Sequence, residues 1–594
     1  MRSGRFIRPP KTSEHKANLR PGRFAILVCC TLLLSAFSCQ LKAQDHFNNL
    51  PEVDASKWTA LENLKISDFK KDTLLISSFG AVHDGITLNT ISIQKAIDAC
   101  SDKGGGVVFI PAGLWLTGPI VLKTGVNLHI ERGGVLQFTG DFNQYPLVAT
   151  NYEGLKAARC QAPISAKDQN HIGITGAGII DGAGDSWRMV KRDKLTTSQW
   201  QTLVSSGGVV DKADRIWYPS KGSLLGAGLK KPGVLEAGKS LSDYKNIKDY
   251  LRPNLLSLIG CKDILLEGVT FQNSPAWCLH PLLCDNIVIR GIYAKNPWYG
   301  QNGDGLDLES CKTVLIENST FDVGDDGICM KSGRDEQGRK RNVPTSNVLI
   351  QFCTVYHAHG GFVIGSEMSG GVNNVAIRHC NFIGTDIGLR FKTTRGRGGI
   401  VENIFASGIN MQDIKGDAIR FDMYYAAQDP VPLVGESRQQ PKKVTVPISE
   451  ATPRFRNFFI KNIVCNGADH ALFFRGLPEM PIQSIYLKNL VMKTRRGIEM
   501  TEADGIFIKN MQLVTTQTGV TPLILDNARN LLLSNITAIQ EGAKRNTNQT
   551  GSMHLQISGK ESKNIKLQNS SFNGSKSAVI QYTSDAAKNA VQVN

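Results

Sequence analysis

The chain has 594 residues, of which 41% are hydrophobic and 20% charged, and its 58 glycines follow no collagen-like period. This composition is typical of an ordered globular protein and excludes a collagenous or intrinsically disordered chain. The formal net charge is +16, but residues 1–43 hold eight Lys or Arg against one acidic residue, Glu14, which leaves about +9 on the rest. A moderately basic surface suits a polyanionic partner, either nucleic acid or an acidic polysaccharide.

The N-terminus has the pattern of an export signal. A basic stretch precedes about fourteen mostly apolar residues, 24–37, a run that is too short for a comfortable bilayer span and typical of a signal-peptide core. We therefore predict a signal peptide over 1–43, with a lipid anchor at Cys39 or an uncleaved anchor helix as alternatives. No later segment approaches spanning length, so we expect an exported protein, periplasmic, extracellular or on the outer surface, without a membrane span.

The next part of the chain predicts a leader, 44–75, and then a capping helix. The segment 90–100 places its apolar residues on one helical face, and the glycines 104–106 end this helix before an apolar strand, 107–110. A helix laid across the end of a strand stack is how a solenoid covers its terminal core.

A short motif then recurs along the chain, in which a turn residue precedes an alternating apolar run and a second short strand. Most steps run from 21 to 34 residues, and the step from Ile264 to Ile287 is 23. Period-2 alternation with Asn and Gly turns predicts an all-β fold, a right-handed parallel β-helix formed by one chain. We place it at 76–580, followed by a C-terminal tail, 581–594, and expect asparagines stacked at the turns to hydrogen-bond to one another. An immunoglobulin-type sandwich would not repeat so evenly.

Two long segments interrupt the repeat, 188–250 and 426–452, and we expect them to project from one face and shape a cleft. The ten cysteines after residue 43 lack the spacing of a stapled domain or of a zinc site, so we predict buried free thiols and no metal or cofactor.

Charged clusters fall on successive repeats between residues 302 and 392. They are Asn302-Gly303-Asp304 with Asp307, Gly324-Asp325-Asp326-Gly327, His359-Gly360 and Arg390-Phe391-Lys392. Asp304 and Asp325 are 21 residues apart, about one coil, which stacks their carboxylates on one face. The glycines beside Asp325-Asp326 predict a turn or bulge that lets both reach a cleft.

Crowding raises the pKa of one carboxyl group and leaves an acid beside ionised bases. Glycoside hydrolysis needs an acid together with a base or a nucleophile. Ordinary β-helix turns explain any one cluster, whereas the whole set favours catalysis.

These residues resemble the motifs of glycoside hydrolase family 28, the polygalacturonases, whose pattern is Asn-Thr-Asp, Gly-Asp-Asp, Gly-His-Gly and Arg-Ile-Lys. The resemblance covers about 76–575 and implies a pectin-lyase-like β-helix, inversion at the anomeric carbon and no metal. It also implies the roles of the site residues. Asp325 would be the general acid, Asp304 and Asp326 would hold and deprotonate the water, and His359 would tune and orient the acid.

By the same resemblance Arg390 and Lys392 would grip a substrate carboxylate. The departures from the family's pattern are Gly303, Ala358 and Phe391, which put the substrate range in doubt rather than the activity.

Other residues are weaker candidates for substrate binding. Asn302 opens the first cluster, Glu367 lines a subsite or is a stacked polar turn residue, and Arg395 contacts a further carboxylate or is solvated. Tyr424 and Tyr425 stack on sugar rings or belong to the core.

We therefore expect a monomeric hydrolase of the bacterial exo-type branch that acts on an acidic polysaccharide and not on nucleic acid. It would cleave α-1,4-galacturonosyl linkages in pectate from the non-reducing end, because eight Lys or Arg between 191 and 231 would meet a terminal galacturonate if 188–250 folds over the groove. A surface loop away from the cleft is the alternative. The rival functions are hydrolysis of a rhamnogalacturonan backbone, a calcium-dependent β-helix lyase, and a non-catalytic polysaccharide binder.

Overall fold

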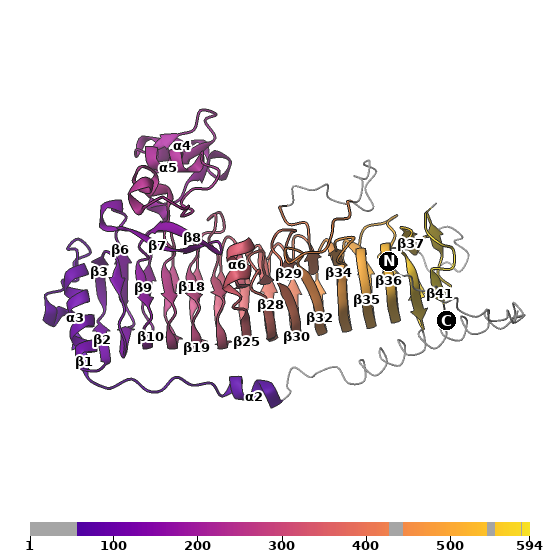
Figure 1. Cartoon of the computed structure of the whole chain (residues 1–594), viewed down its shortest axis with the longest axis horizontal. Helices are drawn as coiled ribbons and strands as arrows, with labels where there is room; N and C mark the ends of the chain where they lie inside the picture. The colour runs from indigo at the N-terminus through magenta and orange to yellow at the C-terminus, as the bar shows by residue number, and fades with distance from the viewer. Residues whose placement is uncertain (1–55, 427–443, 543–552, 576, 584, 594) are drawn as a thin grey trace, which may run out of the picture. The chain divides into compact units, whose positions relative to one another are not determined.

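The computed structural model describes residues 56–426, 444–542 and 553–594, apart from 576, 584 and 594. The predicted signal peptide, Cys39 and most of the proline-rich loop within 426–452 therefore lie outside the described residues. The described chain forms stacked coils of parallel strands (Figure 1). The predicted parallel β-helix is confirmed.

Each coil contributes up to three strands. Equivalent strands of successive coils pair in parallel and form three sheet faces, named A, B and C. Face A consists of β4 (Ile120–Val121), β9 (Ile164–Lys167), β15 (Leu256–Ile259), β18 (Leu279–Leu282), β21 (Leu306–Glu309), β24 (Asp326–Lys331), β27 (Gly360–Ile364), β29 (Leu389–Lys392), β31 (Ile419–Asp422), β33 (His470–Arg475), β37 (Leu555–Ser558) and β40 (Ile580–Tyr582). Residues of face A form the site described below.

The other two faces complete the coils. Face B consists of β1 (Thr73–Leu75), β2 (Gly106–Ile110), β5 (Val126–Ile130), β10 (Asn170–Gly176), β16 (Lys262–Glu267), β19 (Asp285–Arg290), β22 (Lys312–Glu317), β25 (Thr345–Gln351), β38 (Lys563–Gln568) and β41 (Val591–Val593). Face C consists of β3 (Gly113–Thr117), β6 (Gly134–Phe138), β11 (Ile179–Asp181), β17 (Thr270–Gln272), β20 (Tyr293–Lys295), β23 (Thr320–Asp322), β26 (Thr354–Tyr356) and β39 (Ser571–Phe572).

Towards the C-terminus the strands become long enough to turn a corner between faces. Four of them run from face B into face C: β28 (Val372–Ile383), β30 (Ile400–Gln412), β32 (Arg454–Asn466) and β34 (Ile482–Thr494). Two more, β35 (Arg496–Thr515) and β36 (Leu523–Gln540), pass through all three faces.

Asparagine ladders hold the turns between faces. The Nδ2 of Asn489 donates to the side-chain oxygen of Asn462 at 2.9 Å, and Asn510 repeats this bond to Asn489 at 3.0 Å. These side chains sit on residues with φ near +55° to +60°, a left-handed conformation that asparagine tolerates better than most residues. The predicted mutual pairing of turn asparagines is confirmed.

The N-terminal end of the stack is covered by α3 (Thr90–Asp102), which buries Ile93, Ala96, Ile97 and Cys100 in the core. The predicted capping helix is confirmed. The preceding segment is more than a leader, because its end forms β1, which pairs with β2. Its helix α2 (Ser56–Glu62) packs Trp58 and Leu61 against face B residues such as Leu315 and Leu349.

The segment 188–250 folds into small elements above the strands (Figure 1). They are β12 (Val190–Lys191), η4 (Arg192–Lys194), α4 (Thr197–Ser205), β13 (Val209–Val210), β14 (Ile216–Tyr218), α5 (Lys221–Ala227) and η5 (Leu241–Tyr250). Next to it lies an antiparallel hairpin of β7 (Leu147–Tyr152) and β8 (Leu155–Cys160), and α6 (Asp335–Arg341) follows β24. Among the described residues no helix is both long and apolar enough to cross a bilayer.

The C-terminal tail predicted for 581–594 is corrected by the structure. β40 pairs with β37, and β41 pairs with β38, so the last described residues extend the stack. These strands have only three residues each, which is why the sequence pattern ends too early. The ten cysteines from Cys100 to Cys465 are all buried and free, as predicted.

Candidate active site

The predicted charged clusters come together on face A. Leu306 of β21 pairs in register with Ile328 of β24, which aligns the residues that precede the two strands. One carboxylate oxygen from each of Asp304, Asp325 and Asp326 lies within 4.8 Å of the others. The prediction that a 21-residue step stacks these carboxylates on one face is confirmed.

The backbone before Asp325 requires a glycine. A Cβ on Gly324 would lie 2.4 Å from the carbonyl oxygen of Pro297 and 2.8 Å from that of Gly300, which is closer than any side chain tolerates. Asp325 therefore lies in a bend, and β24 begins only at Asp326. The bend turns both carboxylates to the same side, as the flanking glycines predict.

Asp325 is the accessible carboxylate of the three, with 23% of its side chain exposed against 2% for Asp326. Its Oδ1 lies 3.0 Å from Nδ1 of His359, whose Nε2 lies 3.8 Å from Oδ2 of Asp386. The hydrogen bond to Asp325 raises the pKa of His359 above its ordinary value, although burial opposes this. The hydrogen bond therefore favours the protonated imidazole and holds Asp325 in place.

Asp326 is the carboxylate that stays ionised. Its Oδ2 accepts a hydrogen bond from Nζ of Lys392 at 2.6 Å, and its Oδ1 accepts one from Nη1 of Arg390 at 3.2 Å. Burial alone raises the pKa of Asp326, but the two cations overcome it and hold the pKa at about 2. Lys392 is almost fully buried, so water screens its charge little, and its contact with Asp326 is correspondingly strong.

The pKa values of Asp304 and Asp307 are shifted in the opposite direction, above the ordinary value. Burial raises the pKa of Asp304 well above its ordinary value, and the charges of Asp307 and Asp325 raise it further. Burial likewise raises the pKa of Asp307 to about 8, against the pull of Lys331 at 3.4 Å. Protonated carboxyl groups and an ionised one therefore share a single site, with burial as the main cause of the raised pKa values.

Glu367, a candidate for a subsite residue or for a stacked polar turn residue, is buried against other side chains of the protein. Only 8% of Glu367 is exposed, and its carboxylate lies 3.0 Å from Nζ of Lys331 and 3.8 Å from Nη2 of Arg397. Burial raises its pKa, but these cations hold the pKa of Glu367 well below its usual range. Glu367 serves as the counter-ion of Lys331, which the sequence analysis missed. The signal was available: Lys331 ends β24 as Lys392 ends β29.

Two further candidates are engaged by the protein itself. Arg395 donates from Nε and Nη2 to the two carboxylate oxygens of Glu479, at 2.6 and 2.9 Å. This bidentate pair takes the place of the substrate carboxylate expected for Arg395. Asn302 accepts a hydrogen bond from Nη2 of Arg252 at 3.0 Å.

The two candidate tyrosines have different environments. Tyr424 is buried in the core cluster, which excludes it as a stacking platform. Tyr425 is half-buried, and Nζ of Lys392 lies 4.9 Å from its ring centre. Tyr425 therefore borders the cations that contact Asp326.

A cavity of about 530 Å³ opens in front of Asp325 and His359. Its lining includes Lys191 and Lys194 from the segment 188–250, together with the exposed Trp298. Nζ of Lys194 lies 4.8 Å from the ring centre of Trp298. The segment 188–250 thus reaches the catalytic cavity and brings positive charge to it.

The hairpin β7–β8 covers face A on the N-terminal side of the three aspartates. Tyr152 at the end of β7 stacks on Trp277, with ring centres 4.9 Å apart. Trp277 precedes Leu279 as Asp304 precedes Leu306, and these two leucines pair in register. The stacked rings therefore lie over the coil directly before that of Asp304. The sequence analysis missed this hairpin.

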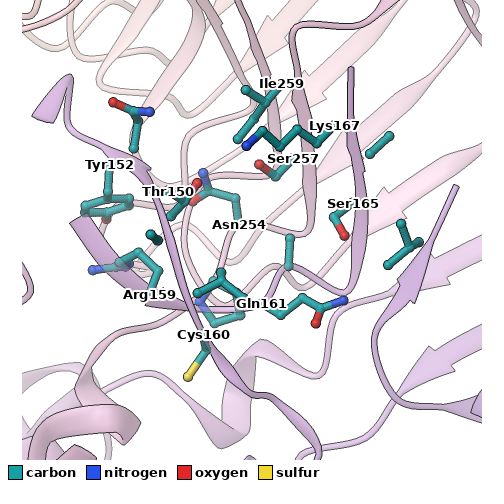
Figure 2. Close-up of a pocket in the computed structure, with 17 residues that line it drawn as sticks. Thr150, Tyr152, Arg159, Cys160, Gln161, Ser165, Lys167, Asn254, Ser257 and Ile259 are labelled. Atoms are coloured by element: carbon teal, nitrogen blue, oxygen red, sulfur yellow. The ribbon is translucent and has the colours of Figure 1, made fainter. Parts of the chain in front are cut away.

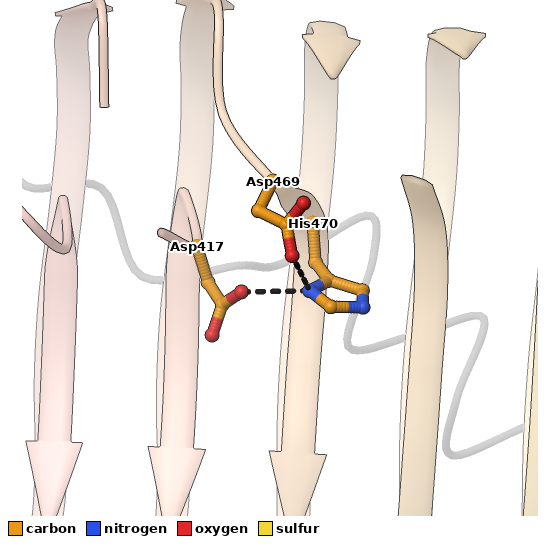
Figure 3. A group of neighbouring side chains, drawn as sticks. All are labelled: Asp417, Asp469 and His470. Atoms are coloured by element: carbon orange, nitrogen blue, oxygen red, sulfur yellow. Dashed lines mark hydrogen bonds and ion pairs between the residues drawn. The ribbon is translucent and has the colours of Figure 1, made fainter. Parts of the chain in front are cut away.

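A second acidic cluster lies farther along the stack (Figure 3). Nδ1 of His470 lies 2.8 Å from Oδ1 of Asp417 and 3.3 Å from Oδ2 of Asp469. Burial lowers the pKa of His470, but the hydrogen bond to Asp417 and the nearby carboxylates of Glu499 and Asp469 raise it to about 9. An imidazole that stays protonated at neutral pH cannot donate a lone pair to a metal. This cluster is an ion-pair network.

Crowded carboxyl groups of opposite protonation on one face are the groups that glycoside cleavage requires, so the fold and the site define a polysaccharide-cleaving β-helix enzyme. The model of "Glycosyl hydrolases family 28" matches residues 221–446. This part of the chain is similar to the family, and the chain is a glycoside hydrolase.

Several relatives and solved structures are similar to this chain. A "Probable polygalacturonase" of Vitis vinifera is 29% identical over 443 residues, 73% of this chain and 76% of the relative. An "Exo-poly-alpha-D-galacturonosidase" of Dickeya chrysanthemi is 28% identical over 396 residues, and the match spans 65% of this chain and 61% of that protein. The crystal structure of an exopolygalacturonase from Thermotoga maritima has a TM-score of 0.62 at 29% identity, covering 78% of this chain and 96% of that one.

Proposed function

We propose that this enzyme is an exo-polygalacturonase, which hydrolyses α-1,4-galacturonosyl linkages of pectate from the non-reducing end with inversion. The closure of the cleft beside the catalytic aspartates carries the proposal. Tyr152 stacks on Trp277 over the coil before Asp304, and Lys191 and Lys194 line the catalytic cavity. A polymer cannot pass through a groove that is blocked on one side, so only a chain end can enter. The similarity to two exo-acting relatives supports the same reading.

Asp325 is the general acid in this proposal. It is the carboxyl group most accessible to a leaving oxygen, and His359 orients it at 3.0 Å. A general acid must lie within hydrogen-bond reach of the oxygen that it protonates, and its neighbours set its pKa. The cavity in front of Asp325 provides the space for that oxygen.

Asp326 and Asp304 hold the attacking water. Asp326 is ionised because Lys392 and Arg390 contact it, so it can accept a proton. Asp304 has an oxygen with no hydrogen-bond partner among the described residues, which leaves a place for the water.

Arg390 and Lys392 lie on the coil that follows His359 and have a double role. They neutralise Asp326, and Arg390, the more exposed of the two at 15%, faces the sugar on the leaving side. A planar guanidinium suits a carboxylate. The substrate is an acidic polysaccharide, and a protein that meets pectate is exported, in agreement with the signal predicted for 1–43.

The test is digestion of long polygalacturonate while viscosity, reducing ends and released sugars are followed together. The proposal expects galacturonate from the start of the reaction, with viscosity nearly unchanged. Proton NMR of the first product reports its anomer, and inversion requires the β form. A sharp early fall in viscosity would mean internal cleavage and would refute the exo assignment.

A further inference from the structure

Two buried arginines lie beside the catalytic site without an acidic partner. Arg159 is 6% exposed and Arg252 is 8% exposed. No carboxylate of the described residues lies within ion-pair distance of either guanidinium, whereas Arg188 pairs with Asp185 and Arg334 pairs with Glu153. A buried charge without a counter-ion is costly, by several kcal/mol even after relaxation. Such a pair of charges is a place where an anion would be strongly stabilised.

The local contacts of these arginines do not neutralise them. Arg252 donates from Nη1 to the carbonyl oxygens of Pro275 and Gln301, at 2.8 and 3.0 Å. Arg159 donates to the carbonyl oxygen of Arg252, and its guanidinium lies 3.6 Å above the ring of Tyr152. The Nε of Arg159 is buried without a hydrogen-bond partner. Burial, together with the nearby charge of Arg252, lowers the pKa of Arg159, and Tyr152 and Glu153 oppose this only in part.

Both arginines line one cavity of about 450 Å³, together with Lys230 and Lys231. Asn302 lines this cavity and also the catalytic cavity that contains Asp325, so the two spaces adjoin. Figure 2 shows Tyr152 and Arg159 projecting from the hairpin side by side, at the border of a smaller pocket over β9 and β15. The hairpin thus closes the groove and at the same time supplies Arg159.

The position of the cavity identifies its occupant. Arg390 and Lys392 lie on a coil C-terminal to the catalytic aspartates, where the proposed function puts the leaving sugar. The arginine-lined cavity lies on the opposite, N-terminal side, where Tyr152 covers the coil before Asp304. The sugar bound on that side is the one that keeps the non-reducing end. In an exo-acting enzyme it is the terminal sugar.

We propose that Arg159 and Arg252 form the subsite for the carboxylate of the non-reducing-end uronate, an inference that rests on the proposed function. The carboxylate of the uronate supplies the negative charge that no described side chain provides to these arginines, and the planar guanidinium matches a carboxylate. The enzyme therefore recognises the acidic end sugar itself. A terminal sugar whose carboxylate is esterified or absent is a poor substrate.

The experiment compares two trigalacturonates, one fully acidic and one with only its non-reducing-end carboxylate methyl-esterified. It uses wild type, Arg159→Gln and Arg252→Lys. The control is Arg192→Gln, which removes an exposed cation of the segment 188–250 whose partner is Asp214. Thermal unfolding verifies that each variant is folded, and calorimetry with galacturonate and with neutral galactose measures binding without turnover. Arg159→Gln is the decisive variant. Arg252 donates hydrogen bonds to two backbone carbonyl oxygens, so its replacement could also change the local structure.

Wild type and Arg192→Gln are expected to prefer the acidic trimer by about 10- to 100-fold in kcat/KM, the worth of one charge-assisted contact. Arg159→Gln is expected to lose this preference and its affinity for galacturonate, while its rate on the esterified trimer stays unchanged. An equal loss on both trimers, or a preference like that of wild type in folded Arg159→Gln, would overturn the subsite. If wild type hydrolyses neither trimer, the proposed function fails, and selective binding of galacturonate over galactose still decides the subsite.

Discussion

Asp307→Asn replaces a buried carboxyl group whose pKa is raised to about 8 with a neutral side chain of the same shape. Between the ordinary value of 3.8 and about 8 the unfolded state releases this proton and the folded state keeps it, so the stability of wild type falls as the pH rises through this range. Asparagine does not ionise, so in the variant this pH-dependent loss of stability is absent. The variant should therefore be more stable than wild type at pH near 7.5 and gain less at pH near 4.5.

The expected difference in stability follows from the three pH units between pH 4.5 and pH 7.5. Each pH unit contributes about 1.36 kcal/mol at most, so three units set a ceiling of about 4 kcal/mol, and relaxation around a buried group brings the expected difference to about 2–4 kcal/mol. Urea unfolding followed by tryptophan fluorescence at both pH values measures it.

Asp141→Asn is the matched control. Hydrogen bonds led by the backbone N–H of Asn143 lower the pKa of Asp141, so its contribution is complete above pH 4 and constant over the same interval. If Asp307→Asn shows no larger stability gain at the higher pH, Asp307 is ionised in the folded protein and held by Lys331, and the reasoning is refuted.

The other predictions concern catalysis and the thiols. Asp325→Asn should lower kcat by about 10²–10⁴-fold with the unfolding midpoint unchanged; an activity above a tenth of wild type would exclude Asp325 as the acid. Lys392→Met removes a cation that holds the pKa of Asp326 down, so the acidic limb of the kcat/KM profile should move to higher pH by about 1–3 units. An unmoved limb would show that Asp326 is not the base. A reducing agent should leave the melting temperature of the protein unchanged, because the ten cysteines after residue 43 are free; a fall would reveal a disulfide.

The fold could be predicted because in a solenoid the contacts are nearly local. Each repeat pairs with the next about 21–34 residues later, so the spacing of turn residues already contains the register. The same spacing brings Asp304 to Asp325 and Asp326. It does not assign protonation, which depends on burial and on cations such as Lys392 and Lys331 from other coils.

The parts that the sequence did not predict depend on contacts between distant segments. The hairpin meets α6 through the bond from the N–H of Arg334 to the carbonyl oxygen of Gly154 at 3.1 Å, between residues 180 positions apart. No periodicity encodes this contact. The pair of Glu367 with Lys331 joins neighbouring coils, but the repeat pattern does not show that both side chains are buried.

Along each strand of face A, residues that fill the core alternate with residues that point outward. In β29 the side chains of Leu389 and Phe391 fill the core, while the intervening Arg390 and Lys392 point to the catalytic side. The ladder hydrogen bonds that join the coils use only the backbone. Substitutions at exposed outward positions therefore leave the core intact, so a lineage can change the polysaccharide that it digests one side chain at a time, without rebuilding its scaffold.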